Sequence, residues 1–294
     1  MVYAGGVSKC VYQVGFTRAL LQHISRSEIT RIACASAGAF TGYAVAADKL
    51  DSIEYLYRTI NITSKRELFW KVFAKGILSD YLDALLSHDD ELTIPMCFPV
   101  CYMPIYSVEY YWIYGVYNRV WKKYLTAASH YPFLQLKPMF MRGKFAIDGG
   151  ACDNIPLFPL LRPPCPPCTS ENTDLIIIQH FDSRYDYRRN FVTDIPVLDI
   201  DLSYCNGFQK RHYDYSSATV ADRLEKSFAY GESIAERLFY GDGSREYLRN
   251  AVNEIFLREY AERQCNLSLD RLVTVLNSVG RIFRKDSSCI KKLF

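Results

Sequence analysis

The chain has 294 residues, of which 49% are hydrophobic and 23% are charged, and this composition excludes an intrinsically disordered protein. The formal net charge of +3 is too small to indicate a nucleic-acid-binding protein, and no segment forms a stripe of lysine and arginine. Aromatic residues make up 15% of the chain, which is more amphipathic ring surface than a plain core requires. Either a wide apolar pocket or a surface that meets lipid would use it.

Two short apolar segments near the N-terminus predict buried strands, and each is followed by a turn of small residues and then a helix. Residues 1–5 form the first strand and lead into two glycines, after which apolar residues recur at helical spacing from about Lys9. Residues 30–35 form the second strand. Residues 37–47 are apolar on nearly every side, which is typical of a helix that is buried all round.

The next part of the chain contains a helical region and then a region that fits no simple pattern. Residues 51–86 carry apolar side chains at helical spacing. Residues 94–117 are aromatic, interrupted by Pro95, Pro99 and Pro104, and match neither the helix nor the strand pattern. Prolines so close together would break a membrane-spanning helix, which needs about 20 apolar residues. We therefore expect no transmembrane segment.

The second half of the chain again alternates strands with helices. Residues 144–148 predict a strand, and residues 174–181 predict the clearest strand of the chain, with a run of branched aliphatic side chains that suits a sheet covered on both faces. Residues 193–203 predict another strand. From Ser216 onward the apolar spacing is helical.

This alternation predicts an α/β fold with a mostly parallel central sheet flanked by helices. The chain has no internal repeat and no long linker, so we expect a single domain over residues 1–294. Within it, residues 1–203 bear the motifs described below and residues 204–294 form a helical C-terminal part.

Ten cysteines without a visible secretory signal predict free thiols in a reducing compartment, and hence a cytoplasmic protein. Cys165 and Cys168 form a CxxC pair, and Cys97 and Cys101 form a CxxxC pair. Together they would supply the four thiolates of a zinc site. Such pairs also arise by chance in a cysteine-rich chain, so we favour a proline-stiffened surface loop around the CxxC and expect no metal.

The C-terminal residues 281–294 hold five basic residues against Asp286, with apolar residues between the charges. This segment either lies on an anionic membrane, which would give peripheral membrane association, or is a frayed tail in solvent. We favour the tail.

Ser36 stands at the predicted junction of a buried strand with a buried helix. The sequence from Cys34 to Gly38 has the spacing of G-x-S-x-G with cysteine in place of the first glycine. This spacing is typical of a nucleophile elbow, a sharp turn that lifts a serine above the edge of the sheet. A serine that merely caps the helix is the simpler interpretation of the segment taken alone.

Gly5 and Gly6 stand at a similar junction, between the first strand and the first helix. Backbone N–H groups on such a turn can converge on a developing oxyanion, and loss of one such donor costs about 3 kcal/mol of barrier. A flexible turn with two glycines is the alternative.

Asp148 ends a predicted strand and is followed by two glycines. Its carboxylate would stand at the carboxyl edge of the sheet, where α/β proteins place their chemistry. The alternative is an Asp-Gly turn, which is a common loop signal.

The three segments, in this order, resemble the patatin-like phospholipases. That family has a glycine-rich oxyanion turn with a basic residue after it, a serine elbow, and a D-G-G element that continues as D-N-x-P and is preceded by A-S-x-x-x-P. The residues that match these elements are Gly5, Gly6, Lys9, Ser36, Gly38, Ala128, Ser129, Pro132, Asp148, Gly149, Gly150, Asp153, Asn154 and Pro156. Later strands and helices fit the family's outline, so the resemblance covers nearly the whole chain.

The resemblance implies a three-layer patatin-like fold and a lipid acyl hydrolase of the phospholipase A or lipase type. Its substrate would be a phospholipid or another acyl lipid at a membrane surface, and no cofactor is implied. Ser36 would be the nucleophile and Asp148 its base, in a dyad without histidine. The implied oxyanion hole is Gly5, Gly6 and Val7, and the implied supporting residues are Lys9, Gly38, Gly149 and Gly150.

An aspartate is a demanding choice of base. In water its pKa is about 3.9, which makes it a weak base for a serine hydroxyl. Partial desolvation in an apolar cleft would raise that pKa, and a direct hydrogen bond would let proton transfer accompany the attack of Ser36.

The chain departs from the family at Val7, Cys10 and Cys34, where the family usually has glycine. The N–H of Val7 can serve an oxyanion provided that the turn needs no positive φ there. These departures leave two alternatives to the hydrolase: a catalytically inactive lipid-binding protein of the same fold, and a transacylase that uses an alcohol acceptor. Retention of both Ser36 and Asp148 favours an enzyme.

Three further features have open interpretations. The aromatic stretch 106–121 is either a lid or acyl-chain wall, or packing beneath the sheet. Lys9 either holds the glycine turn or meets a phosphate head group, although a solvated surface lysine is the simpler expectation. His130 is close in sequence to the site, and we expect it to be a core or rim residue.

Overall fold

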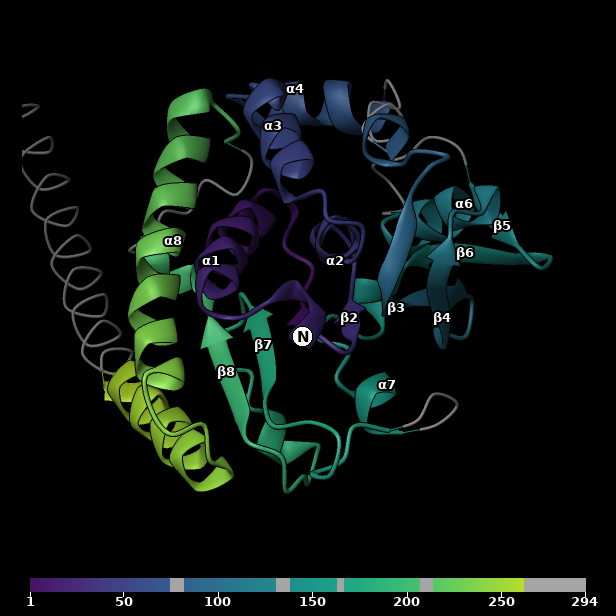
Figure 1. Ribbon diagram of the computed structural model, residues 1–294. Coiled ribbons are helices and arrows are strands. Elements are labelled where there is room, and N and C mark those ends of the chain that lie inside the picture. Colours follow the sequence, from purple (N-terminus) through teal and green to yellow (C-terminus); the bar gives the residue numbers. More distant parts are fainter. Residues whose placement is uncertain (75–81, 131–137, 163–166, 207–213, 262–294) are drawn as a thin grey trace, which may run out of the picture. The chain divides into compact units, whose positions relative to one another are not determined.

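An eight-stranded sheet forms the centre of the protein. The computed structural model shown in Figure 1 describes residues 1–74, 82–130, 138–162, 167–206 and 214–261. The strands run in the order β5-β6-β3-β2-β1-β7-β8, and β4 pairs with β3 off this path. They are β1 (Val2–Tyr3), β2 (Ile32–Cys34), β3 (Glu91–Met103), β4 (Ser107–Val116), β5 (Met139–Met141), β6 (Lys144–Asp148), β7 (Ile176–His180) and β8 (Val197–Asp201).

The expectation of a mostly parallel α/β sheet is confirmed. The pairs β8–β7, β7–β1, β1–β2 and β2–β3 are parallel, whereas β4, β6 and β5 add antiparallel pairs around β3. Each residue of β7 is buried, which explains its unbroken apolar run, because helices cover both faces of a central parallel strand.

Helices lie on both faces of the sheet. One face packs against α1, α2, α3, α6 and α8, and the other packs against the short α7. In Figure 1, α1 and α8 lie side by side next to β7 and β8. The helices are α1 (Cys10–His23), α2 (Gly38–Ala46), α3 (Leu50–Ile60), α4 (Lys65–Leu68), α6 (Arg119–Ala128), α7 (Phe158–Leu161) and α8 (Ser217–Phe239). Within the described ranges, every helix falls short of the length and apolarity that crossing a membrane requires.

Two strands share one edge of β3, and this arrangement positions the site described below. Because β4 occupies one edge of β3 over almost its whole length, β2 and β6 must both pair with the other edge. β2 runs parallel to β3 and its last pair is Ala33 with Cys97. β6 runs antiparallel and ends with Asp148 opposite Val100. The carboxyl ends of β2 and β6 therefore meet head to head beside Phe98 and Pro99.

The region that fitted no pattern forms the β3–β4 hairpin. Two of its prolines lie where the ladder needs no N–H donor. Pro95 coincides with a register shift between Leu92 and Met96, and the carbonyl of Pro99 faces the gap between β2 and β6, where it meets Gly149. Proline is tolerated in strands at such irregular positions. The sequence did not indicate a strand here, because these two prolines are tolerated only through the arrangement of the neighbouring strands.

The helix expected over residues 51–86 is interrupted. α3 ends at Ile60, and the φ of 40° at the next residue, Asn61, is the left-handed conformation that commonly terminates a helix. A new start follows at α4, where the Ser64 hydroxyl accepts a hydrogen bond from the Glu67 N–H. Residues 75–81 of the expected helix lie outside the described residues.

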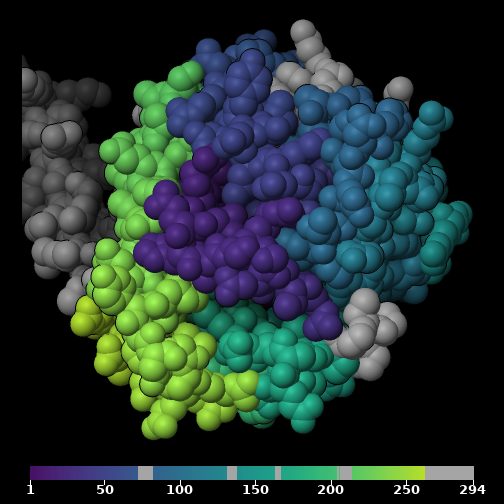
Figure 2. All heavy atoms as spheres, viewed as in Figure 1, coloured from purple at the N-terminus to yellow at the C-terminus, as the bar shows by residue number. Residues whose placement is uncertain are grey.

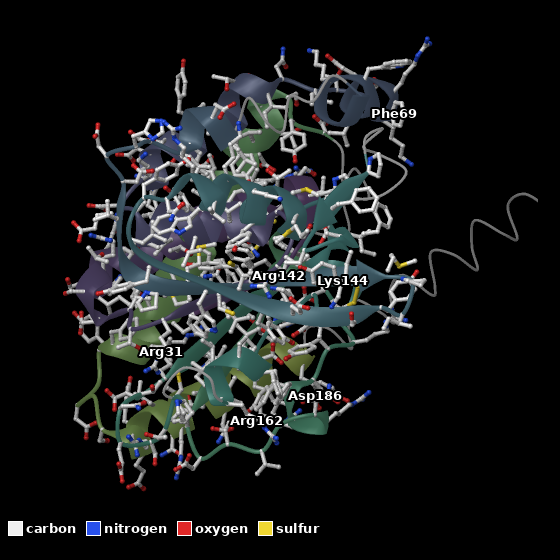
Figure 3. The ribbon with its side chains drawn as sticks, turned by 90° about the vertical axis from the view of Figure 1, so that its right-hand side faces the viewer. Arg31, Phe69, Arg142, Lys144, Arg162 and Asp186 are labelled. Carbon is white, nitrogen blue, oxygen red and sulfur yellow. A yellow bond between two sulfur atoms is a disulfide. The ribbon has the colours of Figure 1, made fainter. Side chains whose placement is uncertain are left out.

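Glu109 of β4 joins the edge strand to the β5–β6 hairpin. Its carboxylate lies 3.1 Å from Lys144 Nζ and 3.5 Å from an Arg142 guanidinium nitrogen, and Figure 3 shows the two basic residues next to each other beside the sheet. The hairpin turn at Arg142 and Gly143 has positive φ at both residues, which is the geometry of a type I′ turn.

The chain divides into two compact units, residues 1–249 and residues 250–294. The first holds the sheet and the helices named above, and residues 250–261 of the second are helical. The single domain over 1–294, with its parts 1–203 and 204–294, stays a prediction. The basic segment 281–294 lies outside the described residues.

Candidate active site

Ser36 lies on the sharp turn between β2 and α2. Its φ of 50° is in the left-handed region, where a residue with a side chain is strained. The strand, turn and helix predicted around it are confirmed. The alternative of a capping serine is wrong, because Ala37 holds the N-cap position of α2 and no side chain caps the helix there.

Small residues allow α2 to start close to the sheet. A side-chain carbon at Gly38 would lie 2.6 Å from the carbonyl oxygens of both Tyr3 and Ala4, well inside van der Waals contact. Gly42, one turn further, makes room for Cys34, because a carbon at Gly42 would lie 3.1 Å from the Cys34 sulfur. Cys34 therefore fits the elbow as an ordinary buried strand residue.

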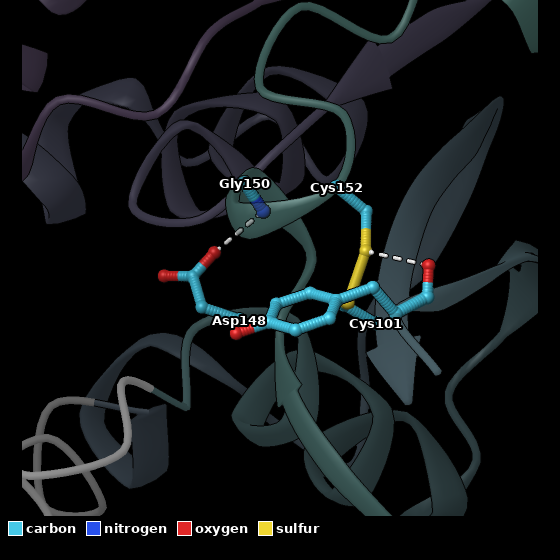
Figure 4. Close-up of a disulfide and its surroundings, with 5 residues drawn as sticks. Cys101, Asp148, Gly150 and Cys152 are labelled. Atoms are coloured by element: carbon cyan, nitrogen blue, oxygen red, sulfur yellow. Dashed lines mark hydrogen bonds between the residues drawn. A yellow bond between two sulfur atoms is a disulfide. The ribbon is translucent and has the colours of Figure 1, made fainter. Parts of the chain in front are cut away.

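Ser36 and Asp148 meet directly. The Ser36 hydroxyl donates a hydrogen bond to Asp148 Oδ2 at 2.6 Å. The other carboxylate oxygen, Oδ1, accepts a hydrogen bond from the Gly150 N–H at 2.7 Å, as Figure 4 shows. The backbone N–H of Asp148 donates to the His130 carbonyl at 2.6 Å. Three contacts thus fix the orientation of the acid, and His130, a buried residue as expected, contributes one of them through its backbone.

Burial changes the acidity of Asp148. Its side chain is 5% exposed, and desolvation raises its pKa to about 6, although the hydrogen bonds from Ser36 and Gly150 act in the opposite direction. An acid with this pKa is a better proton acceptor than a solvated aspartate and is still ionised at neutral pH.

Asp148 ends β6 and its carboxylate lies at the carboxyl end of β2, as predicted, but β6 does not run parallel to β2. β6 is antiparallel to β3, so Asp148 approaches Ser36 from the opposite direction, across the gap beside Pro99. Gly149 is required at this crossing, because a side-chain carbon there would collide with the Pro99 carbonyl. The dyad forms because two strands end at the same point of a third.

The glycine turn lies against the nucleophile. A side-chain carbon at Gly5 would lie 2.5 Å from the Ser36 Cβ, so only glycine fits. The N–H of Gly5 donates to the Asn154 carbonyl at 3.4 Å, which turns this expected oxyanion donor away from the site. The next N–H groups, those of Gly6 and Val7, begin the 3₁₀ turn Val7–Lys9. The first N–H groups of a helix have no acceptor inside it, so these two are the remaining candidates.

Val7 does not meet the condition stated above for an oxyanion donor, that the turn needs no positive φ at this residue. Its φ is 49°, so the turn does place a β-branched residue in the left-handed region, at a cost in strain. Because the chain accommodates this conformation, the Val7 N–H stays a candidate donor in spite of the unmet condition. Its side chain is 42% exposed, so burial does not explain the conformation. Val7 is therefore a second strained residue beside Ser36.

We expect the substitution Val7→Gly to raise the free energy of unfolding by roughly 0.5–1 kcal/mol. The left-handed conformation costs a residue with a side chain about 1–2 kcal/mol, and the greater chain entropy of unfolded glycine returns roughly 0.5–1 kcal/mol of that gain. Urea unfolding monitored by circular dichroism measures the change. Val192→Gly, at a fully exposed position with negative φ, is the control and should lower stability. A destabilised Val7→Gly protein would show that Val7 is unstrained.

Lys9 is half-buried, so the expectation of a solvated surface lysine is wrong. Its ammonium lies 5.7 Å from the centre of the Phe181 ring, and burial lowers its pKa. Its backbone N–H donates to the Gly6 carbonyl at 3.0 Å. Lys9 therefore holds the glycine turn through its backbone and covers Phe181, whose ring also packs against Gly6.

The expectation of free thiols is wrong for two of the cysteines. Cys101 on β3 and Cys152, just after the Asp148 turn, form a disulfide with a Cα–Cα distance of 5.9 Å, and Figure 4 shows it beside Asp148 and Gly150. That Cα spacing lies in the range that a disulfide bridges. The bond ties the turn after Asp148 to the strand that aligns it.

The disulfide also bears on the four-thiolate zinc hypothesis, because Cys101 cannot be a thiolate ligand while it is bonded to Cys152. Cys97 and Cys168 are buried, and Cys165 lies outside the described residues. No cluster of three or more potential metal ligands occurs in the part of the chain that the structure describes.

The aromatic stretch 106–121 is mostly strand β4, and its side chains alternate between two environments. Tyr111 and Ile113 are buried in the main core, which supports the packing interpretation for them. The ring of Tyr110 stacks on that of Phe158 in α7, with 5.9 Å between the ring centroids. A lid or acyl-chain wall stays a prediction.

Asn154 contacts the glycine turn, although the sequence predicts no role for it beyond the D-N-x-P match. Both its carbonyl and its side-chain amide bond to Gly5. The D-N-x-P element marked the residue, but nothing in the sequence indicated which backbone it would meet.

No protein-family model matches the sequence, and no curated protein matches it. Among solved structures, the chain is similar to the crystal structure of VipD from Legionella pneumophila, with 11% sequence identity and a TM-score of 0.41. The alignment covers 90% of this chain and 76% of that chain.

Proposed function

We propose that this protein is a lipid acyl hydrolase of the patatin-like kind, in which Ser36 is the nucleophile and Asp148 the general base. The observation that carries the proposal is the 2.6 Å hydrogen bond from the Ser36 hydroxyl to Asp148 Oδ2. Strain at Ser36 and desolvation of Asp148 are costs that folding alone does not require, and such costs concentrate at active sites.

The first half of the reaction forms an acyl-enzyme. Asp148 takes the hydroxyl proton as Ser36 Oγ bonds to the ester carbonyl carbon, and the carbonyl oxygen becomes an oxyanion. The N–H groups of Gly6 and Val7 are the candidate donors to that oxyanion. Collapse of the tetrahedral species breaks the bond to the alcohol, and the protonated Asp148 gives its proton to the departing alkoxide.

The second half releases the fatty acid. Asp148, ionised again, takes a proton from water as the water oxygen attacks the acyl carbon. The new tetrahedral species breaks its bond to Ser36 Oγ, which recovers the proton from Asp148. Oδ2 faces Ser36, and Oδ1 accepts the hydrogen bond from the Gly150 N–H. The same oxygen, Oδ2, would therefore carry out all of these proton transfers.

The surroundings of the dyad support a lipid substrate presented at a membrane surface. Ile105 and Tyr106, at the tip of the β3–β4 hairpin, are 82% and 59% exposed. The Tyr106 carbonyl lies 3.4 Å from the sulfur of Cys152, so this apolar tip adjoins the Asp148 turn. In the space-filling view of Figure 2, the N-terminal segments (purple) also reach the surface, and they include the exposed Val7. Exposed apolar side chains next to an esterase dyad suit contact with lipid.

The experiment that tests the function compares two esters. We expect the wild type to release free fatty acid from phosphatidylcholine and phosphatidylglycerol vesicles, detected by mass spectrometry, and to hydrolyse soluble p-nitrophenyl butyrate. Ile105→Asp should lower release from vesicles about 10- to 150-fold, because burial of an isoleucine side chain contributes about 1.5–3 kcal/mol, and it should leave the soluble ester unaffected.

Val192→Asp, which places the same charge at an exposed valine elsewhere, should leave both rates unchanged. A wild type that hydrolyses neither ester would contradict the proposed function and would favour the inactive lipid-binding protein. Equal rates of Ile105→Asp and wild type on vesicles would contradict only the role of the hairpin tip.

A further inference from the structure

Asn154 bonds twice to the same residue of the glycine turn. Its side-chain Nδ2 donates to the Gly5 carbonyl at 3.3 Å, and its own carbonyl accepts a hydrogen bond from the Gly5 N–H at 3.4 Å. Both polar backbone groups of Gly5 are therefore held by one asparagine, 149 positions away in the chain.

The side-chain oxygen of Asn154 lies between two glycines. It is 2.5 Å from the position that a Cβ would take on Gly5, and 2.7 Å from the corresponding position on Gly150. The Ser36 Cβ is 2.5 Å and 3.5 Å from the same two positions. The amide of Asn154 thus fills the space between the glycine turn and the Asp148 turn, directly beside the nucleophile.

The segment that presents Asn154 is itself fixed. The Asp153 carboxylate accepts a hydrogen bond from the Tyr110 hydroxyl at 2.7 Å, and the Asp153 N–H donates to the Gly149 carbonyl at 2.9 Å. Cys152, one residue earlier, is bonded to Cys101. Asn154 is therefore an anchored group against which Gly5 is placed, although its own side chain is open to solvent.

We propose that Asn154 is a positioning residue that fixes the oxyanion turn relative to the dyad, an inference that rests on the proposed function. By holding Gly5 it sets where the following N–H groups, those of Gly6 and Val7, stand in relation to Ser36. A displacement of about 1 Å in such donors lowers the rate by up to about 100-fold. The hydrogen bonds that the structure describes for Asn154 go to Gly5 and not to Ser36 or Asp148, so we expect its effect to appear in the transition state.

The test uses Asn154→Ala and Asn154→Asp. Alanine removes the side-chain bond to the Gly5 carbonyl and leaves the backbone bond from the Gly5 N–H. Aspartate keeps the shape of the side chain but places a carboxylate against the Gly5 carbonyl in place of a donor. We expect kcat for p-nitrophenyl butyrate to fall about 10- to 100-fold with KM changed less than about twofold. Affinity for a trifluoromethyl ketone should fall by the same factor as kcat. This probe bonds to Ser36 Oγ, its carbonyl oxygen becomes the oxyanion, and Asp148 takes the serine proton.

The matched control is Asn172→Ala. Asn172 makes a comparable pair of bonds, from Nδ2 to the Pro167 carbonyl at 3.1 Å and from the Thr169 N–H to Oδ1 at 2.9 Å, on the loop before the N-terminal end of β7. We expect it to change thermal stability but neither kcat nor affinity for the ketone.

Two failures can be told apart. An inactive wild type overturns the proposed function and the inference with it. An active wild type whose Asn154→Ala and Asn154→Asp forms keep their kcat and ketone affinity overturns the positioning role alone. If Asn154→Ala does not fold, Asn154→Asp decides, because it preserves the shape of the side chain.

Discussion

Replacing Ser36 with alanine is expected to lower kcat/KM for p-nitrophenyl butyrate by about 10⁶-fold, the order of loss seen when the nucleophile of other serine hydrolases is removed. The substitution deletes one oxygen atom and so removes the only step that forms the acyl-enzyme. Labelling by a fluorophosphonate probe, which bonds to the same Oγ, should disappear together with hydrolysis. Mass spectrometry of the labelled wild type should place the probe on Ser36.

Ser227→Ala is the matched control for this substitution. Ser227 is a buried serine on α8, whose hydroxyl donates to the Arg223 carbonyl at 2.8 Å, so its loss removes a serine hydrogen bond outside the site. This variant should retain labelling and hydrolysis. Undiminished hydrolysis by a folded Ser36→Ala protein would show that the catalytic alcohol lies elsewhere.

Replacing Asp148 with asparagine should have two opposite effects. Hydrolysis should fall by about 10³- to 10⁴-fold, because asparagine cannot accept the Ser36 proton. At pH 7 the free energy of unfolding should rise by on the order of 3 kcal/mol, because the variant no longer buries a carboxylate. The bond from the Gly150 N–H can survive, since asparagine keeps the Oδ1 acceptor. A less active yet more stable protein is the expected result.

The stability difference between Asp148→Asn and wild type depends on pH, and its sign follows from the raised pKa of Asp148. Burial raises the pKa of Asp148 in the folded protein from 3.8 to about 6. Between these pH values the folded protein binds more protons than the unfolded chain, so the free energy of unfolding falls as the pH rises. The difference in free energy of unfolding between Asp148→Asn and wild type should therefore be near zero below pH 4, increase up to about pH 6, and stay constant above it.

Urea unfolding of both proteins from pH 3.5 to pH 8 measures this difference, and other titrating groups cancel in the comparison. The pH profile of wild-type kcat/KM should fall on the acid side with a midpoint near 6, as Asp148 becomes protonated. A variant that is less stable than wild type at pH 7 would mean that the carboxylate is not destabilised by burial.

The sequence was sufficient to predict that Ser36 and Asp148 share one site, but not how the two are brought together. Ser36 and Asp148 were recognisable because a nucleophile elbow and a D-G-G turn have local signatures. The antiparallel direction of β6 has no local signature, since strand direction depends on pairing with β3. The β3–β4 hairpin was missed for the same reason, because Pro95 and Pro99 are acceptable only at a register shift and at a gap between two other strands.

The glycine turn shows the same division between local and distant causes. A turn at Gly5 was visible in the sequence, whereas the reason that position 5 must be glycine, contact with the Ser36 Cβ, was not. The positive φ of Val7 contradicts what a β-branched residue prefers by itself, so no propensity argument could predict it. Asn154 bonds to backbone atoms 149 positions away, and such a pairing is defined only by the folded chain.

Because β2 and β6 meet head to head along β3, their positions on β3 set the distance between Ser36 and Asp148. Ser36 is placed by pairing up to Cys97, and Asp148 is placed by pairing from Val100. One residue inserted between those two positions would separate the alcohol from the acid by about 3.3 Å and turn one of them to the opposite side of the sheet. The distance between the Ser36 hydroxyl and the Asp148 carboxylate is thus determined by the length of a strand that contributes neither group.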